Sequence, residues 1–288
     1  MDKLPPPPPF QPSDFAQTHP GLALLRLAAL LAEGSEADEE TLDMMFEQME
    51  VGALDGLAPG DIWAEFSRGL MGARPGAMVK ALRECGVLEQ LFPEISAVFG
   101  IPQITDTADE IDLGVLLVAS LNEAGRQAAP LEVRTALLLM HAGKSDSPRE
   151  HLPVHYRHIE RAIPRIAAAC DRYDVPERCR DLALLSLHEC ERVQRASPVR
   201  AGPLAAMLDR TGAFRDPELF EALMLVATCD YFGHGDRMGE THPKVELLRA
   251  ARDACTGLDE AGLDADDIAL ARAQAIATTF KSERWAQA

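Results

Sequence analysis

Residues 135–192, TALLLMHAGKSDSPREHLPVHYRHIERAIPRIAAACDRYDVPERCRDLALLSLHECER, decide the fold and contain five of the chain's eight histidines. The apolar runs at 135–140 and 181–187 are typical of buried helices, and each run is followed directly by a histidine. Neutral imidazoles that converge from several helices, together with carboxylates, bind divalent metals. The stretch therefore predicts a helical domain whose histidines are either a working divalent-metal site or the structural remnant of one.

The composition favours an all-α fold. Of 288 residues, 47% are hydrophobic but only 5% are aromatic, and alanine and leucine dominate. The six cysteines form no Cys-x-x-Cys pair, and Cys170, Cys179 and Cys190 are predicted to be small buried hydrophobic residues in a reducing compartment.

The strongly negative net charge restricts which partners the chain can bind. With 46 acidic and 28 basic residues the formal net charge is −18, which opposes non-specific adhesion to nucleic acid or anionic membranes. RNA binding would therefore need a local basic patch. The sequence has no uncharged run long enough to span a membrane and no signal peptide, so a soluble cytoplasmic protein is expected.

Apolar spacing, prolines and glycines divide the chain into helices. Residues 1–18, with five prolines at 5–9, are expected to be a disordered leader. A linker is expected at 102–110 and a loop at 145–154, and His151 and His155, on either side of Pro153, should be exposed. Helices are predicted at 19–33, 36–50, 58–72, 74–95 (broken at Gly86 and closed by Pro93), 111–124, 131–144, 155–172, 176–195, 220–235 and 264–284.

Two stretches carry a family resemblance. Residues 60–95, GDIWAEFSRGLMGARPGAMVKALRECGVLEQLFPEI, resemble the neck and body of bacterial tRNA nucleotidyltransferases, the CCA-adding enzymes, and LRECGVLEQLFPEI is the most specific part. The histidine-rich stretch resembles the HD phosphohydrolase domain that is appended to some of those enzymes. The resemblance implies an elongated helical neck and body at 19–103, a degenerate HD-like domain at 104–245 and a helical tail at 246–288.

The HD resemblance also implies a set of metal ligands. The family's His-Asp-x-Gly-Lys element falls on His141, Ala142, Gly143 and Lys144, apparently one residue short, and a later aspartate falls on Asp230. The implied ligands of a Mg²⁺, Mn²⁺, Co²⁺ or Ni²⁺ ion are His141, His158, His188, Glu189 and Asp230.

Departures from the family pattern weaken this expectation. The family's leading histidine falls on Leu116 and the aspartate of the His-Asp doublet on Ala142, and the combined Gly-Ser and Asp-x-Asp signature of the catalytic head is not found. Two functions stay open. The chain is either a non-catalytic or weakly active module that binds tRNA or a protein in tRNA processing, or a metal-dependent phosphohydrolase acting on nucleotides or cyclic phosphates.

Overall fold

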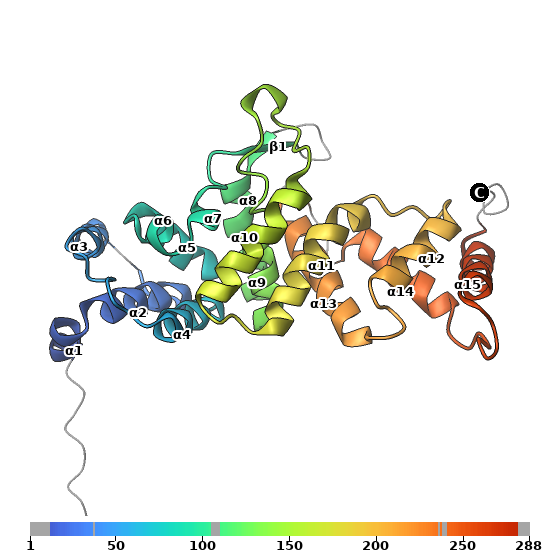
Figure 1. Ribbon diagram of the computed structural model, residues 1–288, viewed down its shortest axis with the longest axis horizontal. Helices are drawn as coiled ribbons and strands as arrows, with labels where there is room; N and C mark the ends of the chain where they lie inside the picture. Colours follow the sequence, from blue (N-terminus) through green and yellow to red (C-terminus); the bar gives the residue numbers. More distant parts are fainter. Residues whose placement is uncertain (1–11, 37, 105–109, 236, 238–240, 282–288) are drawn as a thin grey trace, which may run out of the picture.

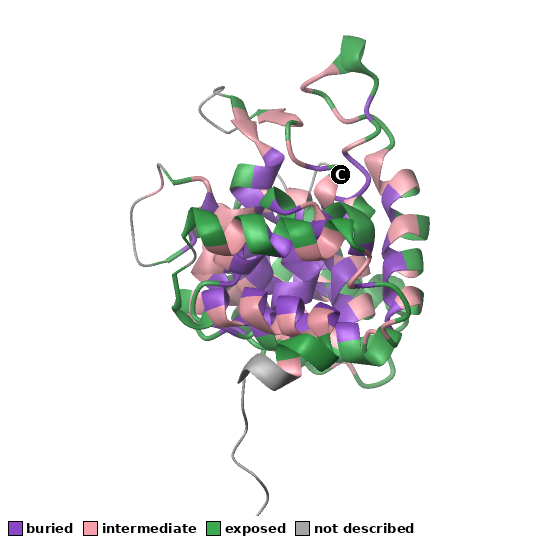
Figure 2. Ribbon diagram, turned by 90° about the vertical axis from the view of Figure 1, so that its left-hand side faces the viewer, coloured by how far each residue is buried: buried purple, intermediate pink, exposed green. Residues whose placement is uncertain are grey.

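The computed structural model describes all residues except 1–11, 37, 105–109, 236, 238–240 and 282–288. Figure 1 shows an elongated molecule whose helices are distributed along the long axis, with α1 at one end and α15 at the other. Seen end-on in Figure 2, the buried residues lie between the helices and the exposed residues form the outer faces.

The helices fall into an N-terminal and a C-terminal group. The first group consists of α1 (Pro12–Thr18), α2 (Pro20–Glu33), α3 (Glu39–Glu50), α4 (Pro59–Leu70), α5 (Pro75–Glu84), α6 (Val87–Leu91) and α7 (Pro93–Ser96). The second consists of α8 (Leu113–Arg126), α9 (Leu131–Leu139), α10 (His158–Arg172), α11 (Glu177–Gln194), α12 (Ala201–Arg210), α13 (Pro217–Gly233), α14 (Pro243–Ala254) and α15 (Ala265–Phe280). A single 3₁₀ turn, Arg149–His151, lies in the loop before α10.

The prediction of an all-α fold is confirmed. The strands found within the described residues are β1 (Pro102–Ile104) and β2 (Glu110–Asp112), which pair antiparallel with Gln103 opposite Ile111. They occupy the ends of the predicted linker and, at residues 111–112, the start of the helix predicted at 111–124. Strands of three residues are too short to show an alternating pattern in the sequence. Asp112 then caps α8 by accepting hydrogen bonds from the backbone N–H groups of Gly114 and Val115.

Helix boundaries show where proline was misinterpreted. The predicted break at Gly86 is confirmed, since this residue has φ 79° between α5 and α6. The preceding helix α6 ends at Leu91, before Pro93 as predicted, but Pro93 also begins the short helix α7, because proline is well suited to the first helical turn. The prediction of an irregular leader is wrong for Pro12–Thr18, which forms α1, while residues 1–11 lie outside the described residues.

One continuous apolar core joins the two groups of helices, running from Leu24 in α2 to Ala277 in α15. At their junction the rings of Phe66, Phe92 and Tyr173 pack in sequence, with centroid distances of 4.3 and 4.7 Å, and the Tyr173 hydroxyl donates to the Leu91 carbonyl. The domain limits at 103 and 245 stay predictions, and the core is continuous across both.

Two features of composition are visible in the structure. All six cysteines are buried free thiols, which confirms the predicted burial of Cys170, Cys179 and Cys190. Among the described residues, none of the helices has the length and apolar character needed to cross a lipid bilayer.

Candidate functional site

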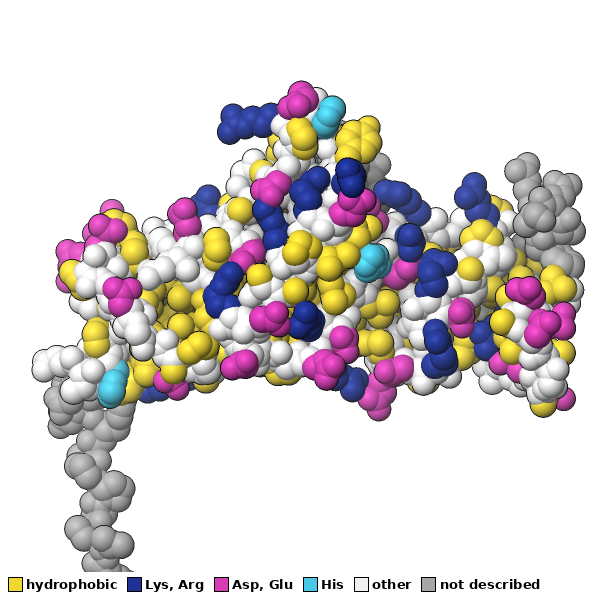
Figure 3. Space-filling view, viewed as in Figure 1, with side chains coloured by type: hydrophobic (Ala, Val, Ile, Leu, Met, Phe, Trp, Pro, Cys, Tyr) yellow, Lys and Arg dark blue, Asp and Glu magenta, His cyan; other side chains and the backbone are white. Residues whose placement is uncertain are grey.

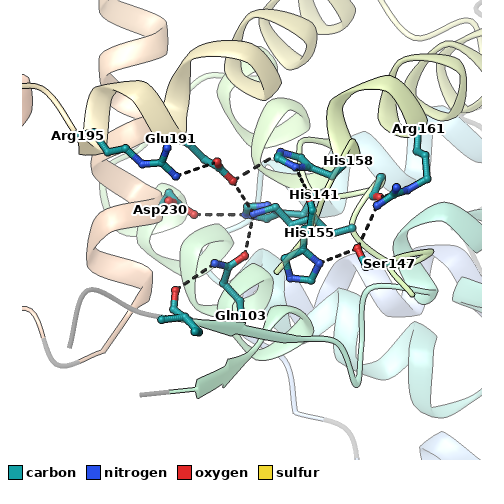
Figure 4. A network of polar contacts seen from close by, with 12 residues as sticks. Gln103, His141, Ser147, His155, His158, Arg161, Glu191, Arg195 and Asp230 are labelled. Atoms are coloured by element: carbon teal, nitrogen blue, oxygen red, sulfur yellow. Dashed lines mark hydrogen bonds and ion pairs between the residues drawn. The ribbon is translucent and has the colours of Figure 1, made fainter. Parts of the chain in front are cut away.

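The candidate site lies where β1, the turn after α9, the loop before α10, α11 and α13 meet (Figure 4). A cavity of about 180 Å³ opens there, lined among others by Gln103, His141, Lys144, Glu191 and Asp230. The site is thus assembled from segments that are distant in the sequence, and the turn at residues 140–147 supplies its centre.

Two arginines of α10 hold that turn in place. Arg161 donates to the Gly143 carbonyl at 3.0 Å and to the Ser147 hydroxyl at 3.0 Å, while Arg165 donates to the Ala142 carbonyl at 2.8 Å. Gly143 is packed so closely that a Cβ atom there would lie 2.0 Å from the His158 carbonyl oxygen. The turn and the first turn of α10 are therefore fixed relative to each other.

His141 and Asp230 form the innermost pair. The Nε2 atom of His141 lies 3.5 Å from Oδ1 of Asp230, and neither of these buried atoms has a regular hydrogen bond within the described part of the chain. Burial, reinforced by the nearby Lys144 ammonium, lowers the pKa of His141. Burial alone would raise the pKa of Asp230, but its contact with His141 and the neighbouring positive charges lower it below its ordinary value.

Lys144 supplies a buried positive charge beside this pair. Its ammonium nitrogen lies 3.1 Å from Oε1 of Glu191 and donates to Oε1 of Gln103 at 2.9 Å, and the side chain is only 4% exposed. Burial opposes ionisation of Glu191, but the charges of Lys144 and His158 outweigh it and lower the pKa of this carboxyl. The Nε2 atom of His158 lies 3.6 Å from the same Glu191 oxygen.

His155 connects the loop to the small sheet. Its Nε2 lies 3.0 Å from the Pro102 carbonyl oxygen and its Nδ1 lies 2.8 Å from the Ser147 hydroxyl, so the carbonyl requires the proton on Nε2. His158 Nδ1 donates in turn to the His155 carbonyl at 2.8 Å. The prediction of an exposed His155 is wrong, whereas His151 is exposed as predicted.

The five predicted ligands do not form one centre. His141 and Asp230 lie together and His158 lies nearby, but His188 is exposed on α11. Glu189 is bound by Arg192 at 2.6 Å and Arg210 at 3.0 Å. In the described part of the chain no group of three His, Cys, Asp or Glu side chains is placed to hold a metal ion. The donor set therefore does not fit the divalent ion that the resemblance implies, and the absence of a bound metal stays a prediction.

Sequence reasoning missed two members of the site. Glu191 follows His188 by less than one helical turn, about 60° away around α11, and it is Glu191 that faces His158 and Lys144. Lys144 was recognised only as part of a motif. The sequence feature that could have identified Glu191 is its position next to the buried Leu187 and Cys190, at the edge of the apolar face of α11.

The histidines make stability depend on pH. Burial, the largest cause, lowers the pKa of His155 from 6.5 to about 4 and also lowers the pKa values of His141 and His158. Between pH 6.5 and about 4 the unfolded chain thus binds more protons than the folded chain, so the free energy of unfolding should fall as the pH falls through this window.

Urea unfolding between about pH 7.5 and about pH 4.5 measures this dependence. His155→Gln should flatten the decline, whereas His188→Gln, which changes an exposed imidazole, should leave it unchanged. A free energy of unfolding that is constant over this pH range would contradict this account of His155. The same conclusion would follow if His155→Gln and the wild type showed the same decline.

Comparison with known proteins agrees with this architecture. Residues 38–99 match the family described as "Probable RNA and SrmB- binding site of polymerase A". Over 238 residues, 83% of this chain, the sequence is 35% identical to the multifunctional CCA proteins of Burkholderia cenocepacia and Cupriavidus metallidurans, and 36% identical to that of Paraburkholderia phymatum. The chain spans 57% of the length of these relatives. It is therefore similar to the multifunctional CCA proteins along most of its own length, and it carries a neck and body like those of the CCA-adding enzymes.

Proposed function

We propose that this chain is an RNA-binding module of tRNA processing, which binds tRNA through a basic patch on α11 and α12 and does not hydrolyse phosphate esters. The names of its relatives and of the family that matches residues 38–99 support an RNA ligand, and the basic patch lies outside the residues of that match. The observation that carries the proposal is the placement of arginines around two glutamates at the end of α11.

Charge is distributed unevenly along the chain. Residues 144–215 contain thirteen basic and ten acidic residues, whereas the rest of the chain contains 15 basic and 36 acidic residues. Figure 3 shows Lys and Arg side chains gathered over the middle of the molecule and towards α12. An RNA backbone is therefore attracted to this segment and repelled by most other parts of the chain.

The basic patch comprises Arg192, Arg195, Arg200, Arg210 and Arg215, all of which are exposed. Arg192 and Arg210 share the carboxylate of Glu189, and Arg195 lies 3.5 Å from Glu191, which also binds Lys144. Two carboxylates are thus surrounded by four cations, and Arg195 keeps 79% of its side chain exposed. Guanidinium groups with free N–H donors of this kind suit phosphate oxygens.

The binding of tRNA can be tested by removing two arginines of the patch. The double variant Arg195→Gln/Arg200→Gln should weaken binding of a fluorescent tRNA transcript by about tenfold at low salt, because each phosphate contact contributes to affinity. Arg178→Gln is the matched control: it is an exposed arginine on the same helix, about 25 Å from Arg195 along the axis. An equal loss of tRNA affinity in Arg178→Gln and in the double variant, or no loss in the double variant, would contradict tRNA binding through the basic patch.

The absence of hydrolysis is proposed from the surroundings of His141. The Lys144 ammonium places a fixed positive charge beside His141 and Glu191. Within the described residues, no three histidine or carboxylate side chains lie close enough together to bind one metal ion. Activation of a water molecule by a metal needs several such ligands. The site is therefore better suited to a structural ion-pair network.

A metal-dependent phosphohydrolase remains the second candidate, because the facing atoms of His141 and Asp230 lack regular hydrogen bonds and border a cavity. Hydrolysis of p-nitrophenyl phosphate and of a 2′,3′-cyclic nucleotide can be measured with Mg²⁺, Mn²⁺, Co²⁺ or Ni²⁺. We expect the wild type and Asp230→Asn to show the same background rate. A wild-type rate that exceeds the Asp230→Asn rate would establish the second candidate instead.

A further inference from the structure

A largely apolar groove lies at the opposite end of the molecule from α15, between α1, α2 and α3. It has a volume of about 680 Å³, and its lining includes Phe15, Leu24, Leu27, Leu30, Met44 and Met45. Where α3 lies in Figure 3, hydrophobic and acidic side chains occur side by side. The groove is remote from the candidate site and plays no part in it.

The α3 helix is poorly buried for its length. Met45 is the buried residue of this twelve-residue helix, while Met44 is 46% exposed and Phe46 is 47% exposed. Helices of this length are marginal in water unless an apolar face is packed against other elements. The α3 helix packs mainly against α2 and α5, and with a further helix in the groove α2 and α3 would form a helical bundle.

The α3 helix, which forms one side of this groove, is strongly acidic. The α3 helix carries Glu39, Glu40, Asp43, Glu47 and Glu50 and no basic residue. Residues 12–50 contain nine acidic residues and a single basic one, Arg26, whose guanidinium is bound to Glu65. Glu40, Asp43 and Glu47 border the groove residue Met44, and their carboxylates attract lysine and arginine.

We propose that this groove binds a basic amphipathic helix of a partner protein. The leucine-type side chains of such a helix would enter the apolar groove and complete the bundle with α2 and α3, while its lysines and arginines would lie over the carboxylates of α3. The chain's own residues 1–11 offer no such match, since they contain one acidic and one basic residue and five consecutive prolines that exclude a helix.

The proposal is tested with a synthetic amphipathic peptide of about 15 residues that carries leucines at helical spacing and lysines elsewhere. Its counterpart carries glutamate in place of lysine. The full-length chain should bind the lysine peptide and not the glutamate peptide, and Met44→Asp should weaken binding by at least about tenfold. If the lysine peptide were held only by attraction between charges, the added negative charge of Met44→Asp would strengthen its binding. The proposal predicts weaker binding, because Met44→Asp removes an apolar contact.

Met71→Asp is the matched control, since Met71 at the end of α4 is also 46% exposed and lies outside the groove. It should bind the peptide like the wild type. In spectra of methyl-labelled methionine, the signals of Met44 and Met45 should shift on titration, while that of the buried Met78 in α5 should not.

Three outcomes would overturn the proposal. The first is equal binding of the lysine and glutamate peptides, or unchanged binding by Met44→Asp. The second is displacement of the peptide by tRNA, which would make the groove an RNA site. The third is an increase in peptide affinity of about tenfold on deletion of residues 1–11, which would identify the leader as the natural occupant.

Discussion

Replacing Arg134 with methionine is expected to lower the free energy of unfolding by about 4 kcal/mol. The Arg134 side chain in α9 is 2% exposed and donates to three backbone carbonyls: Ala129 at 2.7 Å, Leu70 at 2.6 Å and Gly72 at 2.7 Å. Two of these carbonyls belong to the end of α4, so one guanidinium joins the N-terminal and C-terminal groups of helices. Methionine fills similar space but leaves these carbonyls without the donors.

Urea unfolding followed by circular dichroism measures this loss. Arg126→Met is the matched control: Arg126 on α8 is 69% exposed and pairs with Glu123, so its removal should change stability by less than about 0.5 kcal/mol. The loss of stability for Arg134→Lys should lie between those for Arg134→Met and Arg126→Met. Lysine keeps the positive charge, but it lacks the planar guanidinium that donates to three carbonyls. A loss below about 1 kcal/mol for Arg134→Met would show that Arg134 does not join the two groups of helices.

Gly143→Ala is expected to lower the free energy of unfolding by about 3 kcal/mol and to disturb the candidate site. The added Cβ would lie 2.0 Å from the His158 carbonyl oxygen and 2.6 Å from the Ala162 backbone nitrogen, and neither backbone atom can move without displacing α10. Displacement of α10 would also weaken the Arg161 bonds to Gly143 and Ser147.

Gly202→Ala provides the comparison. Gly202 lies in α12 with open space around its Cβ position, so alanine there should be neutral or slightly stabilising. The effect on the site appears in the imidazole signals, because loosening the turn should move the depressed pKa of His158 back towards its ordinary value. If Gly143→Ala and Gly202→Ala are equally stable, the close packing of the turn against α10 is wrong.

The helices could largely be predicted because their signals are local. Apolar spacing and a proline at the start predict Pro20–Glu33 and Pro59–Leu70, and Gly86 marks a break because φ 79° suits glycine. The helices α12 and α14 were not predicted. Each is short, and each begins beside residues that also suit turns, such as Gly202, Pro203 and Pro243.

The candidate site could be predicted only in part, because it depends on how helices are rotated and on contacts distant in the sequence. The pairing of His141 with Asp230 followed from the motif. The choice of His188 and Glu189 failed, since the rotation of α11 turns His188 to solvent and brings Glu191 to Lys144. The contact of His155 with the Pro102 carbonyl spans 53 residues, and no local pattern predicts it.

The dependence of tRNA affinity on salt tests the central claim most directly. Binding of a tRNA transcript is measured between about 50 and about 200 mM salt for the wild type and for Arg195→Gln/Arg200→Gln. We predict that the logarithm of the association constant falls linearly with the logarithm of the salt concentration. In the double variant this slope should be less steep by about two, because two phosphate contacts are removed. Wild-type binding that does not change with salt, or identical slopes for the two proteins, would contradict RNA binding through this basic patch.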